Sequence, residues 1–314
     1  VGGTLSAQGN DANSKGGNIT ALGDNIQIAS GARINASGQT GGGNVLIGGD
    51  WQGSGSLQQA KTVEMQQGAE IKANAMQNGD GGKVVLWSDL KAETGSTSFA
   101  GVIQATAGPE GGQGGKVETS GHALKIAASG QVNSSSPKGQ AGQWLLDPVN
   151  VTIDAAAATA IEDALQTSYV LVTTAGSSTP ANVNPFTSVR VGESGSDGNI
   201  YVNAPMTWNK YVLSLEAHGN VYVNAPITIG AIDNTFNPGT FGGLSIRTGY
   251  STPAVNGGTY DATKVLLFGK TSNAFTGRVV INDDSGNART GFGFRLNDND
   301  YTPVSYTHLR AHET

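Results

Sequence analysis

Acidic side chains are the first candidates for chemistry, because glycoside hydrolysis needs two carboxylates about 5–9 Å apart. Asp283, Asp284, Asp298 and Asp300 lie near one another in the segments INDDSGN and LNDNDY. Asp and Asn side chains also bond to the backbone of the turns that contain them. We interpret both segments as Asx-rich turns, and the sequence predicts no catalytic residue.

Metal and phosphate motifs are incomplete. His308 and His312 have the i,i+4 spacing of a helical zinc site, but the Glu of the H-E-x-x-H motif is missing. NGDGG at 78–82 belongs to no tandem calcium-binding nonapeptide, and no glycine cluster has the phosphate-loop pattern. We interpret NGDGG as a plain turn and His122 as a solvated strand residue. No cofactor and no metal ion are predicted.

Tryptophan side chains are further candidates, because exposed aromatic rings suit the faces of sugars. Trp51 lies between GGD and QGSGS, a loop-like context, and is our candidate surface aromatic. Trp144, within QWLLDP, is predicted to fill the core at a junction.

The composition favours repetitive β-structure over disorder. Gly accounts for 47 of 314 residues and charged residues for 13%, against roughly 25% charged in ordinary soluble proteins. Val, Ile and Leu nevertheless fall into short, regular clusters. The net charge of −6 is spread thinly, so we expect no nucleic-acid partner. No apolar run reaches the roughly 18 residues of a membrane span.

Cysteine is absent, which excludes a disulfide-stapled scaffold. This absence suits a chain that crosses an oxidising compartment unfolded, but it is also compatible with chance. The opening VGGTLSAQGN has no charged and apolar signal regions. We expect any signal peptide to lie upstream or never to have existed, and the chain to be a fragment.

One segment occurs twice: GNIYVNAPMTW at 198–208 and GNVYVNAPITI at 219–229. Alternating apolar residues predict a strand with one buried face, which Pro205 and Pro226 should end. We expect two strands and two turns in each 21-residue coil of a β-solenoid. Tyr201 should then lie over Tyr222, and Asn203 over Asn224, about 4.8 Å apart.

Similar pairs occur at unequal spacing along the chain. GARINA at 31–36 returns as GAEIKA at 68–73, GGN at 16–18 returns at 42–44, and GGKV at 81–84 returns at 114–117. Periods of 20–50 residues indicate a solenoid. Glycine-rich runs such as SGQTGGG and GPEGGQGG are expected to supply turns with positive φ.

Residues 154–168 interrupt this pattern. The segment is rich in Ala, Asp154 is a candidate N-cap, and Ile161 and Leu165 form an i,i+4 apolar stripe. We predict a short helix near 155–167, packed on the solenoid or marking a junction. The predicted organisation is a first β-helical part at 1–143, a continuation with this helix at 144–302, and a tail at 303–314 that is foreign to the fold or disordered.

Residues 114–153 carry a resemblance to the filamentous haemagglutinin-type exoproteins, the two-partner-secretion adhesins of Gram-negative bacteria. The likeness covers most of residues 40–300. The blocks VETSG and WLLDP carry it most strongly; they comprise Val117, Glu118, Thr119, Ser120 and Gly121, then Trp144, Leu145, Leu146, Asp147 and Pro148.

This resemblance implies an all-β, right-handed parallel β-helix at the cell surface. It also implies export through an outer-membrane β-barrel transporter that recognises an N-terminal secretion domain. The Asn-Pro-Asn motifs of that domain are not visible here, so the chain resembles the segment that follows it.

We therefore expect a secreted, non-catalytic adhesin or surface-scaffold segment, with a carbohydrate or a matrix protein as its receptor. Two alternatives stay open. One is a polysaccharide-acting β-helix enzyme, with charged side chains gathered on one face. The other is a passive spacer that carries a distant effector such as a toxin.

Overall fold

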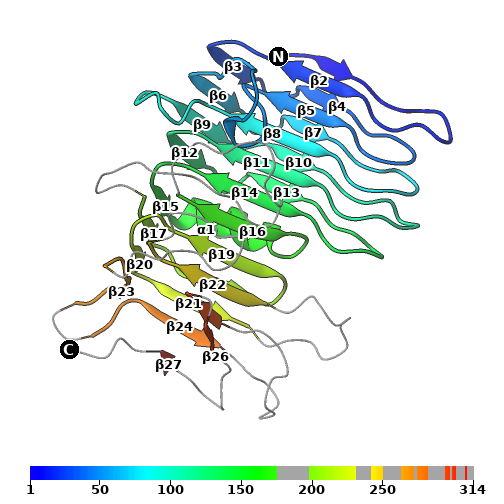
Figure 1. Cartoon of the computed structure of the whole chain (residues 1–314). Coiled ribbons are helices and arrows are strands. Elements are labelled where there is room, and N and C mark those ends of the chain that lie inside the picture. Colours follow the sequence, from blue (N-terminus) through cyan, green and yellow to red (C-terminus); the bar gives the residue numbers. More distant parts are fainter. Residues whose placement is uncertain are drawn as a thin grey trace.

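The computed structural model describes residues 1–174, 198–230, 242–249, 263–271, 274–281, 294–297, 299–301 and 308–309. The chain winds as a right-handed parallel β-helix whose successive coils stack along one axis (Figure 1). Each complete coil of the first half contributes one strand to each of three sheets. The predicted all-β fold is therefore confirmed.

One sheet, which we call the long sheet, follows the axis through nearly the whole described chain. Nine of its strands are parallel, and β26 is added antiparallel to β25. Its strands are β2 (Asn18–Ala21), β5 (Asn44–Ile47), β8 (Lys83–Trp87), β11 (Lys116–Ser120), β14 (Gln143–Asp147), β16 (Tyr169–Thr173), β19 (Val212–Glu216), β22 (Gly243–Arg247), β25 (Phe294–Leu296) and β26 (Asn299–Tyr301).

Two shorter sheets close the first half of the coil. One contains β1 (Thr4–Ser6), β4 (Arg33–Asn35), β7 (Glu70–Lys72), β10 (Val102–Gln104) and β13 (Gln131–Asn133). The other contains β3 (Asn25–Ile28), β6 (Thr62–Met65), β9 (Ser96–Phe99) and β12 (Ala123–Ile126).

Two new sheets replace them in the second half. One contains β15 (Val151–Ile153), β17 (Ile200–Val202), β20 (Val221–Val223) and β23 (Leu266–Phe268). The other contains β18 (Met206–Trp208), β21 (Pro226–Ile229), β24 (Arg278–Ile281) and the antiparallel β27 (His308–Leu309).

Helix α1 (Ala155–Ala164) lies where the sheets change. It contacts β13 of the preceding coil and β18 of the next, so it takes the place of a strand. Asp154 caps it by accepting a hydrogen bond from the Ala157 N–H at 2.9 Å. The predicted helix is confirmed. Because the long sheet and the core run through residue 143 without a break, the two predicted parts share one core.

The core lies inside the coil, on the inward faces of the sheets. One column of the long sheet holds Val45, Val84, Val117 and Trp144 in register, and all four are fully buried. Burying one such aliphatic side chain contributes roughly 1.5–3 kcal/mol. Each coil buries only a thin strip of such residues, so its stability depends on the neighbouring coils.

The repeated segments stack as the sequence predicts. Tyr201 pairs with Tyr222, and their rings lie 4.7 Å apart at 9° to one another. The Asn224 amide donates to Asn203 Oδ1 at 2.7 Å. The prediction of two strands per coil is wrong, however: β17, β18 and β19 all lie within one repeat. Pro226 begins β21 instead of ending a strand, because its ring can occupy the first position of a strand.

The repeated GG pairs have a structural reason that differs from the one we expected. Gly112 has the positive φ predicted for its run, at 119°. In contrast, Gly42, Gly81 and Gly114 have no positive φ. A Cβ on any of these three would overlap a backbone carbonyl oxygen at the end of a strand in the same coil. The first glycine of each pair therefore permits close backbone approach.

Several sequence predictions concern the C-terminal part. Asp283, Asp284, Asp298 and His312 lie outside the described residues. Within the predicted tail at 303–314, only residues 308–309 are described, and they pair antiparallel with β24.

Candidate functional site

The two motif blocks lie side by side on the long sheet. VETSG occupies β11 and WLLDP occupies β14, and the two strands pair in parallel, with Val117 opposite Trp144 and Ser120 opposite Asp147. Stacking of successive coils therefore joins blocks that are separated in sequence. Trp144 is fully buried, as predicted, and its indole N–H donates to Thr119 Oγ1 at 2.9 Å.

Glu118 points to the outer face of β11 but is fully buried. Its carboxylate accepts hydrogen bonds from the Gln52 backbone N–H at 2.7 Å and from the Ser120 hydroxyl at 2.9 Å. It therefore holds the loop that contains the short 3-10 helix η1 (Trp51–Gly53) against the long sheet.

The other motif residues also pack within the fold. Leu145 and Asp147 are buried, and a Cβ on Gly121 would overlap the Ser88 hydroxyl. Pro148 directly follows β14. These positions make the two blocks part of the architecture of the coil.

Trp51 is half-buried and packs on a small cluster outside the main core. This outer cluster consists of Val85, Trp87 and Leu90, with Leu46 and Trp51 against it. The predicted surface aromatic is thus partly covered, and it lies over β5 and β8. His122 precedes β12 and is partly buried, with Nδ1 2.8 Å from the Leu90 carbonyl oxygen, so the prediction of a solvated strand residue is wrong.

Asp50 anchors the loop that carries Trp51. Its Oδ1 accepts hydrogen bonds from the Trp51 N–H at 2.7 Å and from Lys83 Nζ at 2.8 Å. Burial acts to raise the pKa of this carboxyl, but the bonds from Lys83 and Trp51 and the Lys83 charge outweigh it, so the pKa lies below its usual value.

The coupling between Asp50 and Lys83 should therefore depend on pH. A lowered folded-state pKa stabilises the protein above the unfolded pKa of about 3.9, and this contribution is lost as pH falls through the folded pKa. A double-mutant cycle of Asp50→Asn and Lys83→Gln should give about 0.2–1 kcal/mol at pH 7, by urea unfolding. The coupling energy should approach zero once the pH lies well below the lowered folded-state pKa of Asp50, where the carboxyl is protonated. A coupling energy that stays unchanged at low pH would contradict an ion pair between Asp50 and Lys83.

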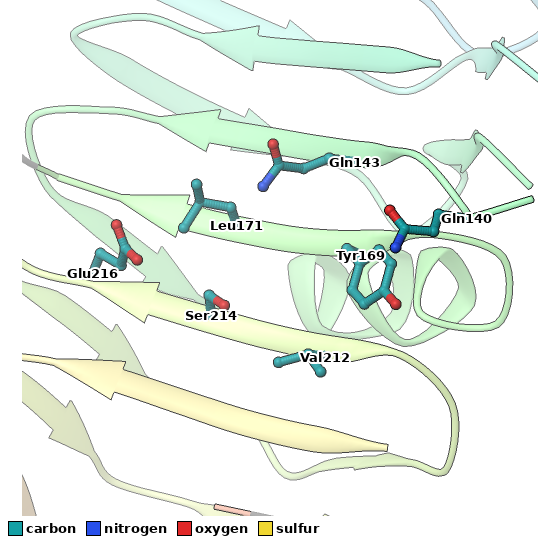
Figure 2. Close-up of a pocket in the computed structure, with 7 residues that line it drawn as sticks. All are labelled: Gln140, Gln143, Tyr169, Leu171, Val212, Ser214 and Glu216. Carbon is teal, nitrogen blue, oxygen red and sulfur yellow. The ribbon is translucent and has the colours of Figure 1, made fainter. Parts of the chain in front are cut away.

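A groove lies on the outer face of the long sheet and begins at β14, the strand that carries most of the WLLDP block (Figure 2). It has a volume of about 260 Å³. Its floor is formed by β14, β16 and β19. The lining side chains are Gln140, Gln143, Tyr169, Leu171, Val212, Ser214 and Glu216.

Neighbouring contacts hold two of these side chains in place. The Tyr169 ring packs edge-on against Tyr211, with centroids 5.2 Å apart. Burial raises the pKa of the Tyr169 phenol. Glu216 forms an ion pair with Arg247 on β22, at 2.7 Å between the oxygen and the nitrogen.

Sequence analysis did not identify this groove. Its lining residues occupy outward positions of three coils, and only Gln140 and Gln143 lie near a recognised motif. Within the described part of the chain, no group of three or more His, Asp or Glu side chains is placed to hold a metal ion.

No known family model matches the chain, and no curated protein matches it either. Among the described residues, no helix is both long and apolar enough to cross a membrane.

Proposed function

We propose that this chain is a non-catalytic attachment segment of a secreted bacterial exoprotein, displayed at the cell surface. The observation that carries the proposal is the long sheet, whose stacked strands run through nearly the whole described chain. A stack of coils places outward side chains at regular intervals along one face, and such extended surfaces suit the binding of other molecules.

The surface chemistry supports this role. Polar side chains stack in ladders on the outside of the coil, such as Asn18 with Asn44 at 2.8 Å and Asn203 with Asn224 at 2.7 Å. With only 13% charged residues, the chain has few of the ionic groups that drive non-specific binding. An ordered surface with few charges favours recognition by shape and hydrogen bonding.

The proposed location follows from the motif likeness. Export through an outer-membrane β-barrel transporter, directed by a secretion domain outside these residues, would deliver the chain to the cell surface. A chain without cysteine forms no disulfide during such a passage. Coils that fold by stacking on their neighbours can form one after another as the chain emerges.

The groove supports binding better than catalysis. Glycoside hydrolysis needs a pair of carboxylates, but Glu216 is the one acidic side chain among the described lining residues. That carboxylate is paired with Arg247. The lining side chains can orient a ligand, but they do not include a pair of groups that could act as catalytic acid and base.

Binding of the purified full chain to an array of glycans and immobilised matrix proteins tests the proposal. We expect saturable binding to at least one of them. The matched control is Val221→Asp, which places a charge in the core position of β20 and should abolish binding by unfolding the coil. If the chain binds neither the array nor host cells, the result would favour a passive spacer. Cleavage of a polysaccharide would favour an enzyme.

A further inference from the structure

The backbone on the floor of the groove is already paired. Strands β14, β16 and β19 each have a parallel neighbour on both sides within the long sheet. An extended peptide that binds by adding a strand needs a free sheet edge. A ligand in this groove instead meets side chains that project from the face of the sheet.

These side chains combine hydrogen-bonding groups with apolar surface. Gln140 and Gln143 supply amides, which both donate and accept, and Ser214 supplies a hydroxyl. In the described structure, the side chains of Gln143 and Ser214 form no hydrogen bond within the protein. Val212, which is half-buried, supplies apolar surface beside them, and the buried Leu171 lies beneath it in the floor (Figure 2).

The groove is close to neutral. The charge of Glu216 is balanced by Arg247, at 2.7 Å. Because burial raises the pKa of Tyr169 above that of a free phenol, its hydroxyl stays protonated at physiological pH. A ligand with a full charge would lose hydration without gaining an unpaired counter-charge.

Hydroxyl groups interspersed with C–H surface, and no net charge, are the features of a neutral sugar ring. We propose that this groove binds one unit of a neutral carbohydrate, with Gln143 and Ser214 bonding to its hydroxyls and Val212 against its C–H face. The proposal rests on the attachment function and names the ligand class for it. A volume of about 260 Å³ is just below the roughly 300–1,000 Å³ of typical small-molecule sites, which suits a single ring.

Saturation-transfer NMR and a glycan array with the full chain test this inference. The probes are glucose, galactose, mannose, N-acetylglucosamine and their neutral disaccharides, with sialyllactose and a heparin tetrasaccharide as charged probes. We expect at least one neutral probe to bind and the charged probes to bind no more tightly than it does.

Three variants locate the binding. Val212→Trp fills the groove from a half-buried outward position and should weaken binding at least tenfold. Gln143→Ala removes one hydrogen-bonding partner and should weaken it about fivefold, as expected for one ordinary hydrogen bond. Gln131→Ala, on the exposed face of β13, is the matched control and should leave binding unchanged. Circular dichroism and the unfolding midpoint verify that each variant is folded.

Binding of no neutral probe at millimolar concentration would overturn the inference, as would binding that folded Val212→Trp leaves intact. Exclusive binding of the charged probes would also overturn it. Adherence to host cells separates the two proposals. Adherence that persists in Val212→Trp retains the attachment function and rejects the groove as its site. If the unaltered chain shows no adherence to host cells, the attachment function is rejected. The NMR result then still decides whether the groove binds a neutral sugar.

Discussion

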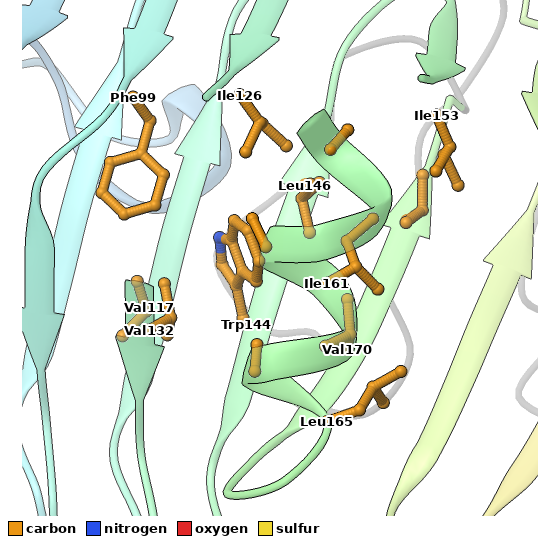
Figure 3. Packing of buried hydrophobic residues seen from close by; sticks show 14 of the residues in the cluster. Phe99, Val117, Ile126, Val132, Trp144, Leu146, Ile153, Ile161, Leu165 and Val170 are labelled. Carbon is orange, nitrogen blue, oxygen red and sulfur yellow. The ribbon is translucent and has the colours of Figure 1, made fainter. Parts of the chain in front are cut away.

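Replacing Trp144 with alanine is expected to lower the free energy of unfolding by about 3–5 kcal/mol, the usual cost of deleting a buried aromatic side chain. Trp144 is fully buried, and its ring packs edge-on against Phe99, with centroids 5.9 Å apart. Figure 3 shows it within the buried cluster that also contains Leu146 of β14 and Ile161 of α1. The substitution removes the ring contact with Phe99 of β9 and leaves Thr119 of β11 without its indole donor.

Urea unfolding followed by circular dichroism measures this effect. Trp144→Phe should recover much of the loss, because it keeps most of the ring volume. Trp51→Ala is the matched control: Trp51 packs only on the outer cluster, so its loss should cost clearly less. Equal losses at the two tryptophans would contradict the assignment of Trp144 to the core.

Trp144 also adjoins Gln143, whose side chain lines the groove on the opposite face of β14. Disturbing the inner face should therefore loosen the floor of the groove. We expect Trp144→Ala to weaken any sugar binding even where the protein stays folded.

Replacing Gly81 with alanine is expected to destabilise the protein by about 1–3 kcal/mol or more, the range for overpacking a tightly packed site. Its Cβ would overlap the carbonyl oxygen of Ala105 and lie 2.6 Å from the amide nitrogen of Gly115. Both obstacles are backbone atoms, so no side-chain rotation relieves the clash. The strands on either side must move apart, which lengthens hydrogen bonds of the stack.

Gly23→Ala is the matched control, because its Cβ would meet nothing closer than an Ile26 side-chain carbon at 3.9 Å. We expect little change in its unfolding midpoint, or a slight rise, since alanine restricts the unfolded chain. Hydrogen exchange should place the damage from Gly81→Ala in β8, β10 and β11. An unchanged midpoint for Gly81→Ala would show that the GG pairs are not required for close approach.

The sequence by itself determined the repeat and its register. Near-identical segments that alternate apolar and polar residues can bury the same face only when they stack in register. The stacking of Tyr201 over Tyr222 could therefore be predicted from the sequence alone. The helix could also be predicted from the sequence, because its cap at Asp154 and its stripe of Ile161 and Leu165 are local signals.

The number of strands in a coil was decided by tertiary structure. A strand of three residues, such as β18, is too short to show a period of its own, and it is stabilised by neighbours from other coils. The role of the GG pairs was hidden for a similar reason. The carbonyl group that excludes a side chain at Gly81 belongs to Ala105, and only the path of the coil brings the two together.

Of all these features, the groove was the least predictable from the sequence, because tertiary structure alone assembles it. Its lining extends from Gln140 to Glu216 and comes from successive coils. Single outward residues such as Ser214 carry no signal in a chain rich in Ser, Gln and Gly. Inward positions are constrained by burial and therefore leave a pattern in the sequence. An outward position gains its neighbours only when coils of unequal length have stacked.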